Sequence, residues 1–177
     1  MPLPELAYLS LGSNLGDRSA SLRTAIDRLA DAGAVRAVSG FYETEPVEVL
    51  DQPWFLNCAV ALEFRQPPEL LLKMLLAIEE KMGRARFKNK GPRVIDIDIV
   101  LFGDRVVNEP GLKIPHPGMQ DRRFVLEPLA EIAPYAVHPV LRKTVRDLLV
   151  ALPAGQSVRR LALPEPNPQP APPVKER

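Results

Sequence analysis

Two aspartates lie inside an apolar segment of the chain, VIDIDIVLFG at residues 94–103. The alternation of isoleucine with Asp96 and Asp98 is typical of a β-strand that has one buried face. Alternate side chains of a strand point to opposite faces, so we expect both carboxylates on one face, with Cα atoms roughly 6.5–7 Å apart. Two carboxylates so close repel each other unless a cation lies between them. Mg²⁺ is a hard cation that binds carboxylate oxygens, so this spacing indicates a metal site.

A basic segment directly precedes these aspartates. Residues 84–93 contain no acidic residue and carry the cations Arg84, Arg86, Lys88, Lys90 and Arg93. Arginine binds phosphate through paired hydrogen bonds, and Mg²⁺ binds phosphate as well as carboxylate oxygens. The combination predicts a phosphoryl-transfer site, with metal ions on one side of a polyphosphate and arginines on the other. The chain contains no GxxxxGK[ST] segment, so a P-loop is excluded.

The residues alone leave other interpretations open. A solvated strand face, or charges that discourage edge pairing, would also explain the two aspartates. A related sheet can bind RNA, but it does so through exposed aromatic residues in a strand pattern that this chain lacks. A metal-dependent nuclease could use the same aspartate pair. The net charge of +1 favours neither a nucleic acid nor an anionic membrane as a partner.

Hydrophobic periodicity and turn residues predict the elements that position these side chains. Their order, β-α-β-β-α-β followed by additions, predicts the α+β class. We expect a ferredoxin-like βαββαβ core, an antiparallel sheet covered by helices, and C-terminal helical additions. Strands are expected at residues 7–12, 34–44, 56–64 and 94–103, a short extra strand at 104–108, and helices at 17–32, 67–83, 122–134 and 144–152.

Length and composition predict one domain and a tail. The 177 residues are 46% hydrophobic, which suits a single domain at residues 1–163 with its own core. Residues 164–177 are rich in proline and have almost nothing to bury, so we expect a disordered tail. Cys58 is the single cysteine, and its apolar surroundings predict a buried thiol. Without a signal sequence or a run of about 18 apolar residues, a cytoplasmic protein is expected.

Several motifs resemble the 6-hydroxymethyl-7,8-dihydropterin pyrophosphokinase family. They are YLSLGSNLGDR, FYETEPV, DQPWFLNCAVAL, GPRVIDIDIVLFGD and IPHPGMQDRRFVLEPLAEIAP, which occur in the family's order and cover about residues 7–135. The resemblance implies transfer of pyrophosphate from ATP to the pterin hydroxymethyl group, with release of AMP, as a step in folate biosynthesis. ATP is then a co-substrate, two Mg²⁺ ions are the cofactors, and the partners are small molecules rather than nucleic acid or membrane.

The resemblance also implies roles for individual residues at the phosphate end of the site. Asp96 and Asp98 would hold the two metal ions, and Arg84 and Arg93 would engage the transferring phosphates. The nucleotide site would comprise Glu79, Arg84, Arg93, His116 and Arg122. Outside the resemblance, His116 would be interpreted as a turn residue, and Glu79 and Arg122 as solvated helix charges.

A flat pterin ring needs stacking partners on its faces and fixed polar groups at its edge. The resemblance places Phe55 and Phe124 on the ring faces and Asn57 at the edge, although ordinary core packing would also explain a phenylalanine. The pterin-binding residues would be Thr44, Val47, Phe55, Asn57, Asp96 and Phe124. The chain departs from some family members at Lys90 and Pro117, where those members carry aromatic residues.

Overall fold

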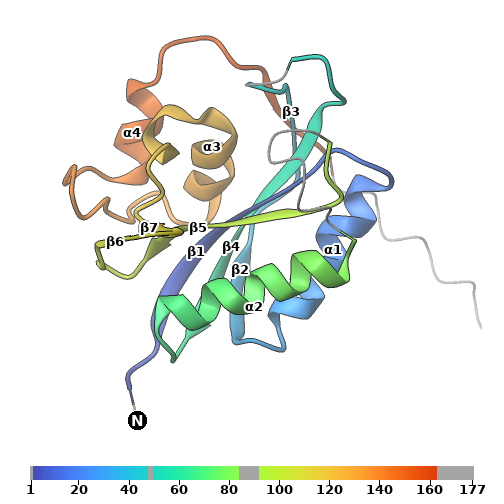
Figure 1. Cartoon of the computed structure of the whole chain (residues 1–177). Coiled ribbons are helices and arrows are strands. Elements are labelled where there is room, and N and C mark those ends of the chain that lie inside the picture. Colours follow the sequence, from blue (N-terminus) through green and yellow to red (C-terminus); the bar gives the residue numbers. More distant parts are fainter. Residues whose placement is uncertain (1, 48–49, 84–91, 163–177) are drawn as a thin grey trace, which may run out of the picture.

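The computed structural model describes residues 2–47, 50–83 and 92–162. Figure 1 shows a central sheet with helices on both of its faces. Among the helices described there, none is both long enough and apolar enough to cross a membrane. The elements are, in chain order, β1 (Glu5–Ser13), α1 (Arg18–Leu29), β2 (Ala34–Val38), β3 (Tyr42–Thr44), β4 (Phe55–Phe64), α2 (Pro68–Lys81), β5 (Asp96–Phe102), β6 (Val107–Glu109), β7 (Leu112–Ile114), a 3₁₀ turn (Met119–Asp121), α3 (Arg123–Ile132), α4 (Val145–Ala151) and β8 (Val158–Arg160).

The main sheet is antiparallel and follows the order β5-β1-β4-β3-β8, with β2 also paired to β4. Because β2 and β3 pair with successive parts of β4, the elements from β1 to β5 form the predicted βαββαβ core. The predicted C-terminal helical additions are α3 and α4, and β6 and β7 form a separate two-stranded sheet. The predicted fold class is therefore confirmed.

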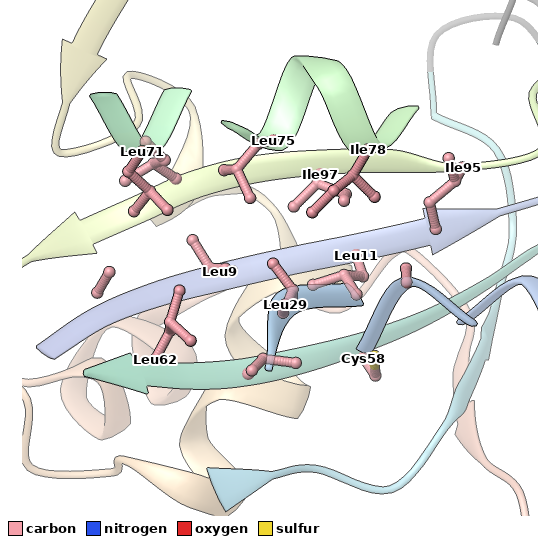
Figure 2. Packing of buried hydrophobic residues seen from close by; sticks show 14 of the residues in the cluster. Leu9, Leu11, Leu29, Cys58, Leu62, Leu71, Leu75, Ile78, Ile95 and Ile97 are labelled. Atoms are coloured by element: carbon pink, nitrogen blue, oxygen red, sulfur yellow. The ribbon is translucent and has the colours of Figure 1, made fainter. Parts of the chain in front are cut away.

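Helices α1 and α2 cover one face of the sheet (Figure 1). Leu71, Leu75 and Ile78 of α2 lie over the strands and pack in one buried cluster with Leu9 of β1 and Ile97 of β5 (Figure 2). Burying each such side chain contributes about 1.5–3 kcal/mol. The isoleucines that alternate with the two aspartates thus pack against helices, as the strand pattern predicted.

Helices α3 and α4 cover only part of the opposite face. Leu126 and Leu129 of α3 pack there in a second cluster with Ala59 of β4 and Val100 of β5. The rest of this face lines a cavity rather than a core. Apart from Phe55 at the start of β4, the strand residues that line it are small or polar: Ser10, Gly12, Thr44, Asn57, Asp96 and Asp98.

The expectation of one continuous strand over residues 34–44 was wrong, because the chain breaks between β2 and β3. Ser39 Oγ accepts the Ala59 N–H at 2.9 Å and donates to the Gly40 carbonyl at 2.7 Å, which replaces the regular ladder. Gly40 packs so closely that an added Cβ would lie 2.7 Å from the Arg160 guanidinium. A local sequence pattern could not indicate this break, because Gly40 packs against Arg160, which is far away in the sequence.

A short extra strand, predicted at 104–108, is present as β6 but begins only at Val107, and β7 and β8 were not predicted. Strand β8 pairs with β3 and is held by an ion pair between Arg159 and Glu43 at 3.0 Å. Three residues with two arginines give no strand pattern, so β8 was missed. The expected tail at 164–177 lies outside the described residues and stays a prediction.

Candidate active site

One cavity of about 350 Å³ gathers residues from segments that are far apart in the sequence. It lies on the sheet face that α3 and α4 leave uncovered, between the segment after β3 and the beginning of α3. Nearly all of the predicted site residues within the described ranges line it. They are Thr44, Val47, Phe55, Asn57, Arg93, Asp96, Asp98, His116, Arg122 and Phe124.

The two aspartates project into this cavity from β5. In the antiparallel register with β1, Asp96 lies beside Gly12 and Asp98 beside Ser10. Both carboxylates are half-buried, whereas the intervening Ile97 faces the helices and is buried. Small neighbours on β1 leave room around the carboxylates, so the predicted same-face pair is confirmed.

Arg93 reaches back over the strand from the segment that precedes it. Its Nη1 forms an ion pair with Asp96 Oδ2 at 3.2 Å, and its guanidinium lies 5.6 Å from the centre of the Phe55 ring. The Nε atom is buried and has no hydrogen-bond partner among the described residues. A buried unpaired donor costs free energy, so this N–H is suited to an anionic ligand.

Asn14 fixes the backbone of Arg93, a role that the sequence did not predict. Its side-chain oxygen accepts the Arg93 N–H at 2.8 Å, and its amide donates to Gln52 Oε1 at 2.9 Å and to the Pro53 carbonyl at 3.0 Å. The motif GSNLG is typical of a strand-to-helix turn in which Ser13, Asn14 or Asp17 caps the helix. Asp17 caps α1, which leaves Asn14 to join three segments around the cavity.

Asn57 lies on the floor of the cavity and is 4% exposed. Its Nδ2 donates to Thr44 Oγ1 at 2.6 Å, which sets the plane of the amide. An added Cβ on Gly12 would lie 2.5 Å from Asn57 Oδ1, so glycine is the residue that fits beside this amide. A fixed amide offers both a donor and an acceptor to the edge of a flat heterocycle.

Two phenylalanine rings line the same cavity, and an arginine lies over each. The Arg93 guanidinium lies over the Phe55 ring, and the Arg122 guanidinium lies 5.7 Å from the centre of the Phe124 ring. Both rings are partly exposed to the cavity and are not fully buried in the core. Such rings can stack on an aromatic ligand while the guanidinium groups meet its anionic part.

His116 is fixed by its backbone and by its ring. Its N–H donates to the carbonyl of Val100, which has no partner on β1 because the register shifts at this point. Its Nδ1 accepts the Gly118 N–H at 3.1 Å. Burial, followed by the nearby charge of Arg122, lowers the pKa of His116, against an opposing effect of Asp96. A neutral ring with Nδ1 accepting has its proton on Nε2, which can donate to a ligand.

A second cavity of about 290 Å³ adjoins the first and shares Asp98 and His116 with it. Its other lining combines apolar side chains, among them Leu72 of α2 and Leu112 of β7, with the cation Lys113. The shared aspartate and histidine thus lie between the two cavities. This arrangement can hold two different ligands with their reacting ends at Asp98.

Among the predicted nucleotide residues that the structure describes, Glu79 lies away from both cavities. It is 3% exposed and accepts the Ile97 N–H at 2.7 Å. The interpretation of Glu79 as a solvated helix charge is therefore wrong, and its role toward the nucleotide stays a prediction. Arg84 lies outside the described residues, so its role also stays a prediction.

The carboxylate oxygens of Asp96 and Asp98 on β5 suit a hard cation that also binds oxygen atoms of water or substrate. Within the described ranges there is no group of three or more His, Cys, Asp or Glu side chains suited to a metal ion. Mg²⁺ is commonly bound by one or two carboxylates together with water and substrate phosphates. Asp96 and Asp98 provide such a pair beside the phosphate-suited Nε of Arg93.

Comparison with known proteins gives matches over most of the chain. The family model described as 7,8-dihydro-6-hydroxymethylpterin-pyrophosphokinase (HPPK) matches residues 8–134. A 2-amino-4-hydroxy-6-hydroxymethyldihydropteridine pyrophosphokinase from Methylorubrum extorquens is 45% identical over 152 residues, covering 84% of this chain and 95% of that protein. The protein of the same name from Bacillus subtilis is 46% identical over 129 residues, covering 72% and 77% respectively.

Other matches belong to longer proteins. The folic acid synthesis protein fol1 of Schizosaccharomyces pombe is 44% identical over 157 residues, which are 88% of this chain but 21% of the yeast protein. The chain thus spans about a fifth of that relative. The crystal structure of wild-type Plasmodium falciparum HPPK-DHPS has a TM-score of 0.67 at 18% identity, covering 83% of this chain and 44% of that one. This likeness supports the fold alone.

Proposed function

The chain belongs to the 7,8-dihydro-6-hydroxymethylpterin-pyrophosphokinase family, and from this premise we propose that it transfers pyrophosphate from ATP to the hydroxymethyl group of the dihydropterin. The observation that carries the proposal is the junction of two cavities at Asp98 and His116. One cavity suits a flat polar ring, and the other, lined by apolar side chains and Lys113, suits a nucleotide, with phosphate-binding groups between them. The reaction is a step in folate biosynthesis, and the cytoplasmic location remains a prediction.

The larger cavity is suited to the pterin. Phe55 and Phe124 offer ring faces for stacking, and Asn57, oriented by Thr44, offers a donor and an acceptor to the amide edge. Val47 lies at the rim and is 49% exposed. We infer that its backbone and that of Thr44 also contact the ring, from the end of β3 and the segment that follows it.

The groups at the junction are suited to the triphosphate. Arg93 and Arg122 bring two guanidinium groups to the cavity, and the neutral His116 ring can donate a hydrogen bond from Nε2. Such fixed donors hold the phosphates in line and stabilise the charge of the transition state. Arg84 is expected to add a further guanidinium, and Glu79 to support the nucleotide from α2.

Asp96 and Asp98 would hold the two magnesium ions implied by the family. When bound, these ions supply neutralisation of the negative charge on the triphosphate. The pair is suited to this role because both carboxylates face the cavity and Ile97, between them, anchors the strand in the core. Arg93 also provides a balancing charge for Asp96, with which it forms an ion pair at 3.2 Å.

The transfer is proposed as a single in-line displacement. The oxygen of the pterin hydroxymethyl group forms a bond to the β-phosphorus of ATP. The bond from that phosphorus to the oxygen shared with the α-phosphate breaks, and AMP leaves with its electron pair. The hydroxyl proton passes to the surrounding water. The protein's contribution is to align the two substrates and to stabilise charge.

A coupled assay for AMP tests this function. The purified chain is supplied with ATP, Mg²⁺ and 6-hydroxymethyl-7,8-dihydropterin, and the controls omit the pterin or add EDTA. We expect AMP only when both pterin and metal are present. AMP release without pterin, or its absence from a folded protein with all components, would contradict the proposal, and nuclease assays would then follow.

A further inference from the structure

We propose that Gln156 is a positioning residue that sets the spacing of the two walls of the larger cavity. Gln156 does not line the cavity itself, but its side-chain amide bonds to a backbone group in each wall. The inference rests on the proposed function, because the spacing matters for a ring bound between those walls.

The first wall begins with helix α3. The N-cap residue of this helix, Arg122, makes no side-chain capping bond, so the first N–H groups need acceptors from elsewhere. Gln156 Oε1 accepts the Phe124 N–H at 3.2 Å and serves as such an acceptor. Arg122 and Phe124 both line the cavity, so this bond holds the helix end that carries them.

The second wall is the segment that follows β3. Gln156 Nε2 donates to the Glu45 carbonyl at 2.8 Å. The neighbouring Ser157 donates its N–H to Glu45 Oε1 at 2.6 Å and accepts the Glu45 N–H at 3.2 Å. Thr44 and Val47 on either side of Glu45 line the cavity, so Gln156 ties their segment to the start of α3.

The connection is long-range, and Gln156 lies outside the part of the chain that the family model matches, residues 8–134. Gln156 is 32 residues from Phe124 and 111 residues from Glu45. It is held in place by β8, whose pairing with β3 begins at Val158 and Thr44. The half-buried Gln156 amide forms hydrogen bonds to backbone groups in both walls. These bonds restrict the separation of the walls, although the amide does not touch the ligand.

Three variants separate the positioning role from general stability. Gln156→Ala removes both bonds. Gln156→Glu keeps an acceptor for the Phe124 N–H but loses the donor to the Glu45 carbonyl. Arg159→Ala is the matched control, because it removes an exposed side chain from the same region and its ion pair with Glu43, while leaving the Gln156 bonds in place.

Equilibrium binding of 6-hydroxymethyl-7,8-dihydropterin and of ATP is measured for each protein. Loss of two neutral hydrogen bonds predicts a rise of about tenfold in the pterin Kd of Gln156→Ala. The rise in the ATP Kd is expected to be smaller, because only Arg122 among the proposed nucleotide residues lies at the helix end that Gln156 holds. Gln156→Glu is expected to bind pterin more weakly than the wild type, and Arg159→Ala to match the wild type. Equal weakening in Gln156→Ala and Arg159→Ala, or wild-type affinity in either Gln156 variant, would overturn the inference.

Amide hydrogen exchange at Phe124, measured without ligand, separates this inference from the proposed function. We expect faster exchange in Gln156→Ala and retained protection in Gln156→Glu, because the latter keeps the acceptor. Unchanged exchange in Gln156→Ala would overturn the contact itself. Failure of the wild type to bind pterin would contradict the proposed function, whereas normal wild-type binding with an unaffected Gln156→Ala protein would contradict the positioning role alone.

Discussion

Asp98 lies where the two cavities meet, and at the residue scale it is the most informative position. We predict that Asp98→Asn lowers kcat about 100-fold or more, since an amide cannot replace a charged ligand in stabilising the transferring phosphates. Steady-state kinetics with saturating Mg²⁺ measures this effect. Asp104→Asn, an exposed change just after the same strand, is the control and should retain wild-type turnover. Near-normal kcat in Asp98→Asn would contradict the metal assignment.

A substitution at Gly12 tests whether the Asn57 amide binds the edge of the pterin ring. In Gly12→Ala the new Cβ would lie 2.5 Å from Asn57 Oδ1, so the amide must leave the position set by Thr44. We expect the pterin Kd to rise about tenfold, because a group that recognises the ring edge is displaced, while ATP binding is kept. Calorimetry with each ligand checks this. Gly155→Ala, whose Cβ would meet nothing within 4 Å, is the control. Equal pterin affinity in both variants would refute the role of this contact.

Protonation of His138 is expected to contribute to the pH dependence of folding stability. Burial lowers its pKa from the ordinary value of 6.5, and its Nδ1 accepts the N–H groups of Val140 and Leu141. The folded state therefore binds this proton less readily than the unfolded state. The stabilisation is complete above about pH 6.5 and is lost as the pH falls through the folded-state pKa.

His138→Asn keeps an acceptor for the turn but cannot titrate. Denaturant unfolding at a series of pH values is expected to show a smaller loss of unfolding free energy below pH 6.5 in this variant than in the wild type. Identical pH profiles for the two proteins would show that His138 does not contribute.

At the scale of elements, α2 joins the core to the site by packing against β5. Leu75 is 1% exposed and points at the strands (Figure 2). Leu76 on the same helix is 50% exposed. We predict that Leu75→Ala lowers the unfolding free energy by about 2–5 kcal/mol, and Leu76→Ala by less than about 0.5 kcal/mol. Denaturant titration of both proteins measures the difference. Equal losses would contradict the assignment of this face of α2 to the core.

The whole molecule uses one sheet for two purposes. The face toward α1 and α2 is a continuous apolar core, and the opposite face is divided between the α3–α4 contact and the cavity. The order of elements and the facing of Asp96 and Asp98 could be predicted, because strand and helix periodicity are local properties. The roles of Asn14 and Gln156 could not, since each acts through single polar contacts with distant segments and produces no repeating pattern.

Identification of the pterin product is the direct test of pyrophosphoryl transfer by this chain. The purified chain is incubated with ATP, Mg²⁺ and 6-hydroxymethyl-7,8-dihydropterin, and the products are separated and identified by mass spectrometry. We expect a pterin that carries a pyrophosphoryl group, formed in equal amount with AMP. A singly phosphorylated pterin formed with ADP, or AMP and free pyrophosphate with an unchanged pterin, would contradict it.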